Sequence, residues 1–291
     1  PIRAEGREGR ESLTEEPELG TNIQMLKSFL DRKPVRAILS LMTHTCPKDR
    51  KSFLETALEL ISGVREGACF LCTHVATPLV RWALSTSCRH LNTDLEKFKE
   101  TLKLSYWRRG IVSVLKGIAK FGVRRPFTPG APILVVWNFT WACNLRCKHC
   151  YAKAGPVPRP NELSTSEALR TVHMLADAGV TIIALSGGEP LMRKDAYKVL
   201  ELARDYGIYT AIATNGTLIT REVARRLKEL DLLYVEISVD GARPETHDAF
   251  RGIPGAFEMA IRGARNCVEA GIWTQVAMTI TRDNVAELPA V

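Results

Sequence analysis

The sequence lacks a long apolar run. Its longest, "APILVVWNFTWAC" (residues 131–143), carries Pro132 and Asn138 and is shorter than the roughly 18–20 residues that a bilayer-spanning helix needs. No secretory signal is visible either, although the sequence begins at Pro1 rather than at a methionine, which leaves a processed or missing start open. We therefore expect a chain without transmembrane segments.

The sequence also lacks the regular cysteine spacing of a disulfide scaffold. In a chain of this size without a secretory signal, clustered cysteines more often bind metal than form disulfides. A reducing cytoplasm is therefore the expected location. The eight cysteines fall into uneven groups, which are Cys46, Cys69, Cys72 and Cys88, then Cys143, Cys147 and Cys150, and finally Cys267.

Acidic residues are absent from residues 101–130, which hold seven lysines and arginines and supply most of the net charge of +8. Tyr106, Trp107 and Phe121 lie among these cations. Residues 101–125 would therefore suit an anionic membrane surface, an acidic peptide or nucleic acid. A helix that packs its apolar side on the rest of the protein fits the same pattern, and we favour it.

The chain divides into three parts. Residues 1–20, rich in Glu, Gly and Arg, are expected to form a disordered arm. Apolar residues three and four apart predict a helical N-terminal domain over residues 21–125. The segment "RRPFTPGAP" (124–132) marks a boundary because proline and glycine interrupt regular structure. The second domain is predicted to span residues 126–291.

This second domain alternates short apolar segments with helical ones, which predicts parallel βα units. The carboxyl ends of parallel strands share one edge, so the polar segments that follow the strands, such as "SGGEP" and "SVDG", are expected at one rim. The expected strands are residues 133–140, 180–187, 209–215, 234–240 and 273–281, and the expected helices are residues 164–179, 193–207, 221–231 and 255–271.

The segment "CNLRCKHC" (143–150) holds three cysteines and no fourth. Iron–sulfur clusters usually take four cysteines, so three would leave one iron open to a substrate or cofactor. A catalytic metal keeps an open coordination position in the same way. A zinc site completed by His149 or by a distant cysteine is an alternative, as are three unligated core thiols. We favour the cluster.

With Tyr151 added, "CNLRCKHCY" is similar to the CxxxCxxC signature of the radical S-adenosylmethionine (radical SAM) enzymes. The resemblance covers about residues 132–284 and is strongest to the branch that often carries a C-terminal SPASM domain, which includes peptide maturases and haem-biosynthesis enzymes. It implies an α/β fold with a partial (βα)6, TIM-barrel-like core behind an α-helical N-terminal domain. Such cores usually have six βα units. Because only five strands are predicted here, we expect the sixth unit and any C-terminal extension to be missing.

The resemblance implies that Cys143, Cys147 and Cys150 hold a [4Fe–4S] cluster whose remaining iron binds S-adenosyl-L-methionine (SAM). Reductive cleavage of SAM would give a 5′-deoxyadenosyl radical that takes hydrogen from a peptide or tetrapyrrole-type substrate. The chain would then be an oxidoreductase or maturase, with a reductant such as ferredoxin or flavodoxin as its partner. Competing interpretations are an iron–sulfur electron-transfer protein without SAM chemistry and a barrel that serves only as a binding scaffold.

The resemblance also assigns roles at the strand ends. "SGGEP" would contact the methionine amino group of SAM, and Ser238 its carboxylate or ribose. Asn215 would face the ligand or only form a turn. Asp240 shares a strand face with Ser238, and would face the ligand or cap the next loop. The candidate cofactor-binding residues are Gly187, Gly188, Glu189, Asn215, Ser238 and Asp240.

Weaker candidates follow the fourth and fifth strands. In "THDAFRG" (246–252), His247, Asp248 and Arg251 would bind substrate, but helix capping by Thr246 and Asp248 is the interpretation we favour. At the fifth strand end the candidates are Thr279, Thr281 and Asn284. Cys267 lies among apolar neighbours and is expected in the core.

The N-terminal cysteines Cys46, Cys69, Cys72 and Cys88 include a CxxC pair. They would bind an auxiliary iron–sulfur cluster or a zinc ion, with His44, His74 and His90 as alternative ligands. A reduced helical domain with ordinary buried cysteines is the interpretation we favour.

Overall fold

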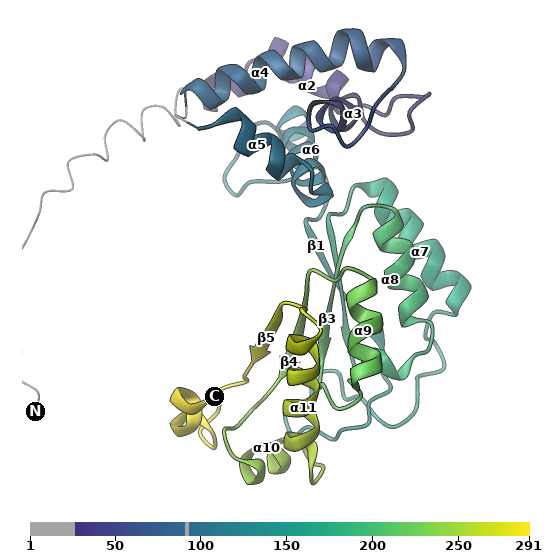
Figure 1. The fold of residues 1–291 in the computed structure, drawn as a ribbon, viewed down its shortest axis with the longest axis vertical. Coiled ribbons are helices and arrows are strands. Elements are labelled where there is room, and N and C mark those ends of the chain that lie inside the picture. Colours follow the sequence, from purple (N-terminus) through teal and green to yellow (C-terminus); the bar gives the residue numbers. More distant parts are fainter. Residues whose placement is uncertain (1–26, 91–92) are drawn as a thin grey trace, which may run out of the picture.

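The computed structural model describes residues 27–90 and 93–291. The predicted arm, residues 1–20, and the first residues of the predicted helical domain lie outside this described part. Helices alone make up the described chain up to Phe121, and a parallel sheet with helices makes up the rest (Figure 1). No helix of the described residues is both long enough and apolar enough to cross a membrane.

The first part is helical up to Phe121. Ser52 starts one of its helices by accepting the Glu55 N–H, and Asp94 starts another by accepting the Glu96 N–H, as N-cap residues do. These elements are α2 (Lys33–Met42), α3 (Phe53–Ile61), the π-helical turn η1 (Cys72–Ala76), α4 (Thr77–His90), α5 (Leu95–Leu102) and α6 (Ser105–Phe121).

The second part contains one five-stranded parallel sheet in the order β1-β2-β3-β4-β5. This confirms the predicted α/β fold with a parallel sheet, although β5 is shorter than predicted. The strands are β1 (Leu134–Thr140), β2 (Ile182–Gly187), β3 (Tyr209–Thr214), β4 (Tyr234–Ser238) and β5 (Thr274–Ala277).

Helices connect each strand to its neighbour, which is the connectivity of a singly wound barrel wall. Helix α7 begins with a capping box between Ser164 and Glu167 and ends at Gly179 in the left-handed conformation. The connecting elements are α7 (Thr165–Ala178), the short η2 (Pro190–Met192), α8 (Ala196–Asp205), α9 (Arg221–Glu229), α10 (Pro244–Arg251) and α11 (Ala256–Glu269), and η3 (Val285–Ala290) follows β5.

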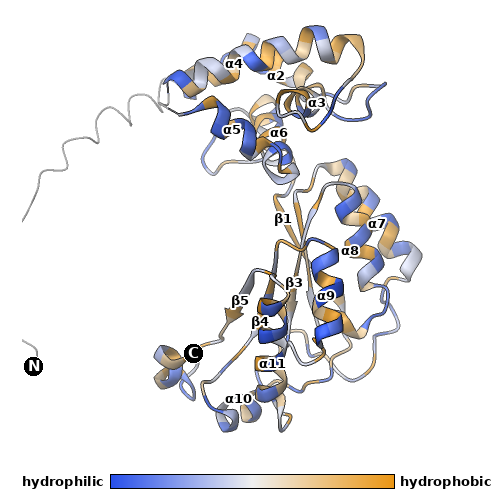
Figure 2. Cartoon of the chain, in the orientation of Figure 1, coloured by the Kyte–Doolittle hydropathy of each residue, from blue (hydrophilic) through white to orange (hydrophobic). Residues whose placement is uncertain are grey.

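One face of the sheet packs against these helices and forms the main core. Ile183, Leu185 and Ile212 of the strands and Leu200 and Leu227 of α8 and α9 are fully buried there. Figure 2 shows the alternation of hydrophilic and hydrophobic positions along α9, as expected for a helix with one buried face. On β1, Leu134 and Val136 are exposed, so among the described residues the other face of the sheet stays open.

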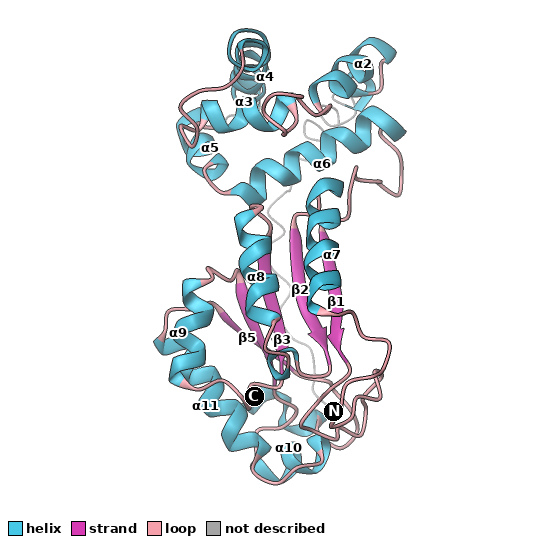
Figure 3. Cartoon of the chain, turned by 90° about the vertical axis from the view of Figure 1, so that its right-hand side faces the viewer, coloured by secondary structure: helices cyan, strands magenta, loops and turns pink. Residues whose placement is uncertain are grey.

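The helical part has its own apolar cluster and meets the sheet at the amino ends of the strands (Figures 1 and 3). Arg109 on α6 makes this contact. Its guanidinium donates to the carbonyls of Val180, Tyr206 and Ala176 at 3.1, 3.1 and 3.0 Å. Val180 and Tyr206 precede β2 and β3, so the helices are fixed at the edge opposite to the cysteine segment.

Candidate cofactor site

A cavity of about 240 Å³ opens at the carboxyl ends of the parallel strands. The loop after β1 supplies the three cysteines, and the ends of the other strands supply polar groups. Parallel α/β folds place their ligands at this edge. The lining includes Cys143, Cys147, His149, Cys150, Tyr151, Ser186, Gly187, Gly188, Thr214, Asn215, Glu236, Ser238, Arg251 and Thr279.

The sulfur atom of each cysteine accepts a hydrogen bond. The Leu145 N–H donates to Cys143 Sγ at 3.4 Å, the Ala154 N–H to Cys150 Sγ at 3.4 Å, and Arg251 to Cys147 Sγ at 3.5 Å. At Cys143 the Leu145 N–H acts to lower the pKa of the thiol and so favours the thiolate, the form of cysteine that binds metal. Burial alone acts the other way and raises the pKa of the Cys143 thiol.

The three sulfurs of the cavity do not belong to a close group of metal ligands. Within residues 27–90 and 93–291, one set of three or more His, Cys, Asp or Glu side chains has its ligand atoms within 4.8 Å of one another, and it lies in the helical part. His149 stacks on Phe250, with ring centroids 4.5 Å apart. The alternative of a zinc site made by the three cysteines and His149 therefore does not fit the geometry.

The two glycines of "SGGEP" bring the end of β2 close to the end of β1. A Cβ on Gly187 would lie 2.5 Å from the Thr140 carbonyl oxygen, and one on Gly188 would lie 2.2 Å from that of Ala142. The Gly188 N–H donates to Thr140 O at 2.7 Å. This segment was predicted to contact the methionine amino group of SAM. In the structure its glycines allow close approach of the backbone at the end of the preceding strand.

Glu189 is fully buried and does not line the cavity. Its carboxylate accepts hydrogen bonds from the Thr214 hydroxyl at 2.9 Å, the Asn215 N–H at 2.9 Å and the Leu191 N–H at 3.1 Å. Burial raises the pKa of this carboxyl despite these donors. The predicted direct contact with an ammonium group therefore differs from the structure, in which Glu189 ties the end of β2 to the end of β3.

Asn215 and Ser238 both line the cavity, and Asp240 does not. The Asn215 amide donates to Asn144 Oδ1 at 2.8 Å and lies 3.9 Å from Cys143 Sγ. Asp240 lies beyond the end of β4, where its carboxylate pairs with Arg251 at 2.5 Å and accepts the Thr279 N–H at 2.8 Å. The expectation that Asp240 faces the ligand beside Ser238 is therefore not met, because the strand ends before it.

Sequence reasoning did not place Arg251 and Glu236 beside the cysteines, and the structure does. Arg251 is buried, lines the cavity and joins Cys147 to Asp240. Its contact with Cys147 spans 104 residues of sequence, so no local pattern indicates it. Glu236 lines the cavity two residues before Ser238. A carboxylate in an apolar strand, on the face of a candidate residue, was the available signal.

Asp248 caps a helix other than its own. It accepts the Gly255 N–H at 2.5 Å and the Phe257 N–H at 2.8 Å at the start of α11. The predicted helix capping therefore holds for Asp248, at the start of α11, whereas the Thr246 hydroxyl donates to Glu287. The start of α10 is held instead by Glu287, which accepts the backbone N–H groups of Ala242 and Arg243 at 2.7 and 3.2 Å.

The other weak candidates have internal partners. His247 accepts the Asp240 N–H at 3.1 Å. Asn284 is buried and donates to the carbonyls of Asp240 and Thr279, and it accepts the Thr281 N–H. Cys267 lies in the main core.

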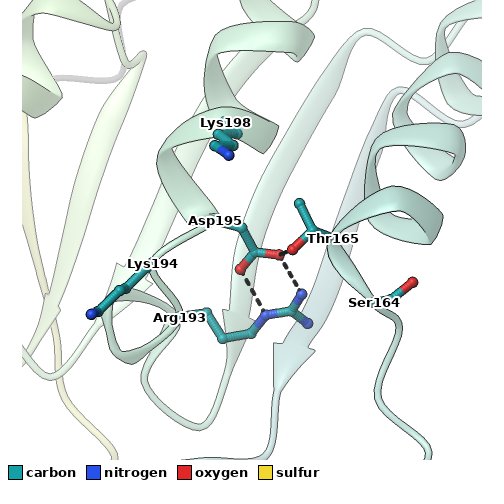
Figure 4. Close-up of a pocket in the computed structure, with 6 residues that line it drawn as sticks. All are labelled: Ser164, Thr165, Arg193, Lys194, Asp195 and Lys198. Atoms are coloured by element: carbon teal, nitrogen blue, oxygen red, sulfur yellow. Dashed lines mark hydrogen bonds and ion pairs between the residues drawn. The ribbon is translucent and has the colours of Figure 1, made fainter.

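A second hollow lies at the start of α8 (Figure 4). Arg193 contacts both carboxylate oxygens of Asp195, at 3.0 and 2.6 Å, and Thr165 donates to the same carboxylate at 2.8 Å. Arg193 also donates to Phe139 O at 2.9 Å. These groups join the ends of β1 and α7 to α8. They are structural contacts, apart from the cysteine cavity.

Comparison with known proteins agrees with this geometry. Residues 137–291 match the sequence model of the family described as the Radical SAM superfamily. The Fe-coproporphyrin III synthase of Methanosarcina barkeri is 50% identical over 158 residues, which cover 54% of this chain and 39% of that protein. The AdoMet-dependent heme synthase of Nitratidesulfovibrio vulgaris is 44% identical over 163 residues, covering 55% and 44%.

A third relative has a different product. Mycofactocin maturase MftC of Mycobacterium tuberculosis is 40% identical over 159 residues, covering 54% of this chain and 40% of the relative. The chain thus spans less than half the length of each of these relatives. Among solved structures, Streptococcus suis SuiB bound to S-adenosylmethionine has a TM-score of 0.55 at 18% identity, covering 81% of this chain and 52% of SuiB. This last likeness supports the fold alone.

Proposed function

Because the chain belongs to the radical SAM superfamily, a family of enzymes that use a [4Fe–4S] cluster and SAM, we propose that Cys143, Cys147 and Cys150 hold such a cluster in the cavity. The observation that carries this proposal is that the three cysteines of one short motif line a single cavity at the carboxyl ends of the strands. Each cysteine of a [4Fe–4S] cluster would bind a different iron.

No fourth cysteine of the described residues lines the cavity. The proposed cluster would keep one iron for SAM, and it would supply the electron that cleaves SAM to a 5′-deoxyadenosyl radical. An electron-transfer protein with a fully ligated cluster would need a fourth protein ligand here. The geometry therefore favours the SAM enzyme over that alternative.

The roles proposed for the other residues follow their positions. Ser238 and Glu236 project from β4 into the cavity and would contact SAM directly, as would the backbone of Gly187 and Gly188. Asn215 holds the cysteine loop through Asn144. Glu189 and Asp240 would not contact SAM but would position other groups, because Glu189 fixes the strand ends and Asp240 orients Arg251.

The substrate class we propose is a tetrapyrrole, with a peptide as the second candidate. The relative at 50% identity and that at 44% identity are named for tetrapyrrole products, and the relative at 40% identity is a maturase. The radical would abstract hydrogen from that substrate. A reductant such as ferredoxin or flavodoxin would supply the electron, and thiolate-bound iron favours the reducing cytoplasm as the location.

Anaerobic electron paramagnetic resonance of the iron-reconstituted, dithionite-reduced chain tests the cluster and its open iron. We expect a [4Fe–4S]⁺ signal that changes when SAM is added and that is lost in Cys147→Ala. Cys267→Ala, which removes a core thiol outside the cavity, is the matched control and should keep the signal. A cluster spectrum that SAM leaves unchanged would indicate full protein ligation and would overturn the proposal.

A further inference from the structure

The helical part holds a second group of sulfur ligands, at the end of the molecule opposite to the cavity. Two segments with the same spacing form it, Cys46-Pro-Lys-Asp49 and Cys69-Phe-Leu-Cys72. Their four ligand atoms all lie within 4.8 Å of one another. Cys88 was predicted to be the fourth member, but it lies outside this group, and the Asp49 carboxylate takes that place.

The scaffold holds these four side chains in position. Cys46 and Asp49 lie on a tight loop between α2 and α3, which is closed by a bridge between Thr45 and Ser52 and by the Cys46 N–H donating to Lys51 O at 2.8 Å. Arg50 in this loop has a φ of +56°, a conformation that non-glycine residues seldom adopt. Residues 70–90 form a continuous helical segment. Cys69 lies directly before it, and Cys72 lies in its first turn.

The two segments contact each other through the carboxylate. Asp49 Oδ2 accepts the Cys69 N–H at 3.2 Å, and Asp49 Oδ1 pairs with Arg65 at 2.6 Å. Cys46 and Cys72 are 2% and 0% exposed, so the sulfurs point inward. Arg65 supplies positive charge beside a group that would be strongly anionic with every ligand deprotonated.

The distances distinguish one ion from a cluster. Cys46 Sγ lies 3.6 Å from Cys69 Sγ and 3.5 Å from Asp49 Oδ2. Zn–S bonds of about 2.3 Å and a Zn–O bond of about 2.0 Å at tetrahedral angles give S···S and S···O separations of about 3.8 and 3.5 Å. An iron–sulfur cluster spreads its cysteines over different irons, which four atoms within 4.8 Å do not allow.

We propose that Cys46, Asp49, Cys69 and Cys72 bind one Zn²⁺ ion in a closed tetrahedral site. Thiolate-rich tetrahedral sites select zinc among the common divalent ions. Four protein ligands leave no position for substrate, so the role of the ion is structural. It joins the loop before α3 to the helical segment after it, beside the apolar cluster that contains Leu54, Leu58 and Val80.

The metal content of the full chain tests this proposal, with Cys143, Cys147 and Cys150 all replaced by alanine so that the cavity binds no iron. By plasma mass spectrometry we expect one zinc per chain. Cys72→Ser in this background should lose the zinc, whereas Cys88→Ser, which removes a buried thiol outside the group, should keep it. Iron with labile sulfide at this site, or no metal together with a Cys46–Cys69 disulfide, would overturn the proposal.

Cobalt substitution tests Asp49 in a variant that keeps four ligands. With Co²⁺ in place of zinc, we expect the visible bands of tetrahedral cobalt and a thiolate-to-cobalt band in the near ultraviolet. Asp49→Cys should retain the metal and strengthen that band in proportion to four thiolates rather than three. An unchanged band in Asp49→Cys would show that Asp49 is not a ligand and would overturn the proposed set.

Discussion

Arg251 connects the cysteine loop to a buried carboxylate. Its guanidinium contacts Cys147 Sγ at 3.5 Å and pairs with Asp240 at 2.5 Å, and both residues of the pair are buried. Replacing Arg251 by Gln would leave the Asp240 charge buried without its cationic partner, although the Thr279 N–H would still donate to it. We expect a loss of about 3–5 kcal/mol in the free energy of unfolding, which is the usual cost of breaking a buried ion pair. Urea unfolding followed by circular dichroism measures it.

The double variant Arg251→Gln/Asp240→Asn is the matched control for this prediction. It removes both charges, so most of the lost stability should return. If the double variant is as unstable as Arg251→Gln, the ion pair is not the cause of the loss.

The glycines at the end of β2 are a second feature at this scale. In Gly188→Ala the added Cβ would meet the Ala142 carbonyl at 2.2 Å, and that carbonyl belongs to backbone that cannot rotate away. We expect a loss of at least about 1–3 kcal/mol, the range for overpacking, together with altered iron binding in the adjoining loop. Thermal unfolding and iron content check the two effects.

Gly155→Ala is the control, because nothing lies within 4 Å of a Cβ built on Gly155 although its backbone pairs with the cysteine loop. Its stability should stay within about 0.5 kcal/mol of that of the unchanged chain. Equal losses in the two variants would show that the close approach at Gly188 is unimportant.

Short sequence patterns predicted the cavity residues whose positions depend on their own neighbours in the sequence. The three cysteines share one short motif, and Ser238 ends a strand whose two faces are set by the alternation of its residues. The positions of Glu189 and Asp240 depend on partners elsewhere in the chain, Thr214 and Arg251. Those contacts exist only after the strands align, so the spacing of residues in the sequence did not reveal them.

Helix α10 depends at its start on a residue far along the chain. Glu287 accepts hydrogen bonds from the Ala242 and Arg243 N–H groups and from the Thr246 hydroxyl, and it pairs with Arg243. The hydrogen bonds from Thr246 and Arg243 lower the pKa of Glu287 from 4.5 to about 2. A carboxyl whose pKa is lower in the folded chain than in the unfolded chain stabilises the fold at pH values above its unfolded pKa. This contribution is lost as the pH falls from about 4.5 towards 2.

The prediction is that Glu287→Gln unfolds at a lower temperature than the unchanged chain at pH 7, and that this gap narrows as the pH falls to 3. Calorimetry at a series of pH values measures the gap. Glu245→Gln, an exposed residue of the same helix, should show no such pH-dependent gap. A Glu287→Gln gap that stays constant with pH would contradict the assignment.

Arg109 helps to fix helix α6 to the sheet part, where Tyr106 of the same helix also packs against Tyr209 of β3. Arg109→Ala removes hydrogen bonds to three carbonyls, and bonds from a charged donor contribute more than neutral ones. We expect a loss of about 2–4 kcal/mol in the free energy of unfolding. Arg109→Lys, with a single ammonium group, should recover part of it. Chemical denaturation measures both variants, and an unchanged midpoint in Arg109→Ala would contradict the prediction.

The sequence indicated the elements better than their contacts. Its alternating segments correspond to β1–β5 and the helices between them, because strands buried in a parallel sheet are continuously apolar. The basic segment 101–125 was open to two interpretations. Arg108 donates to the carbonyls of Leu102 and Lys103, and Arg109 to those beside the sheet, which supports the favoured one, a helix that packs on the rest of the chain.

Of the three apolar clusters among residues 27–90 and 93–291, the largest lies in the sheet part, the second in the helical part, and a small third one beside the cysteine loop. The predicted domains, residues 21–125 and 126–291, stay a prediction that hydrogen exchange can test. If the proposed zinc site stabilises only the helices, a strong chelator should speed amide exchange in α3, η1 and α4 and leave β2 and β3 unchanged. Exchange that rises equally in both parts would show one cooperative unit.

The whole fold was predictable in class because strand and helix periods differ and recur along the chain. The contacts between the helical part and the sheet part were not predictable. Nothing in the sequence near Arg109 indicates the carbonyls at Ala176 and Tyr206, which lie 67 and 97 residues away. For the same reason, the sequence did not indicate that Asp49 rather than Cys88 is the fourth member of the ligand group. Only folding brings the two short segments together.

The burial of the two sulfur groups differs in a way that matters for handling the protein. In the proposed zinc group Cys46 and Cys72 are buried and Cys69 is half-buried, whereas at the cavity Cys143 is buried and Cys147 and Cys150 are half-buried beside Tyr151, which is 75% exposed. If both proposed sites are filled, air and chelators would reach the metal at the cavity before the metal of the zinc group. A preparation made in air would retain one metal and lose the other, so each can be loaded in turn by order of addition, with zinc during expression and iron later under nitrogen.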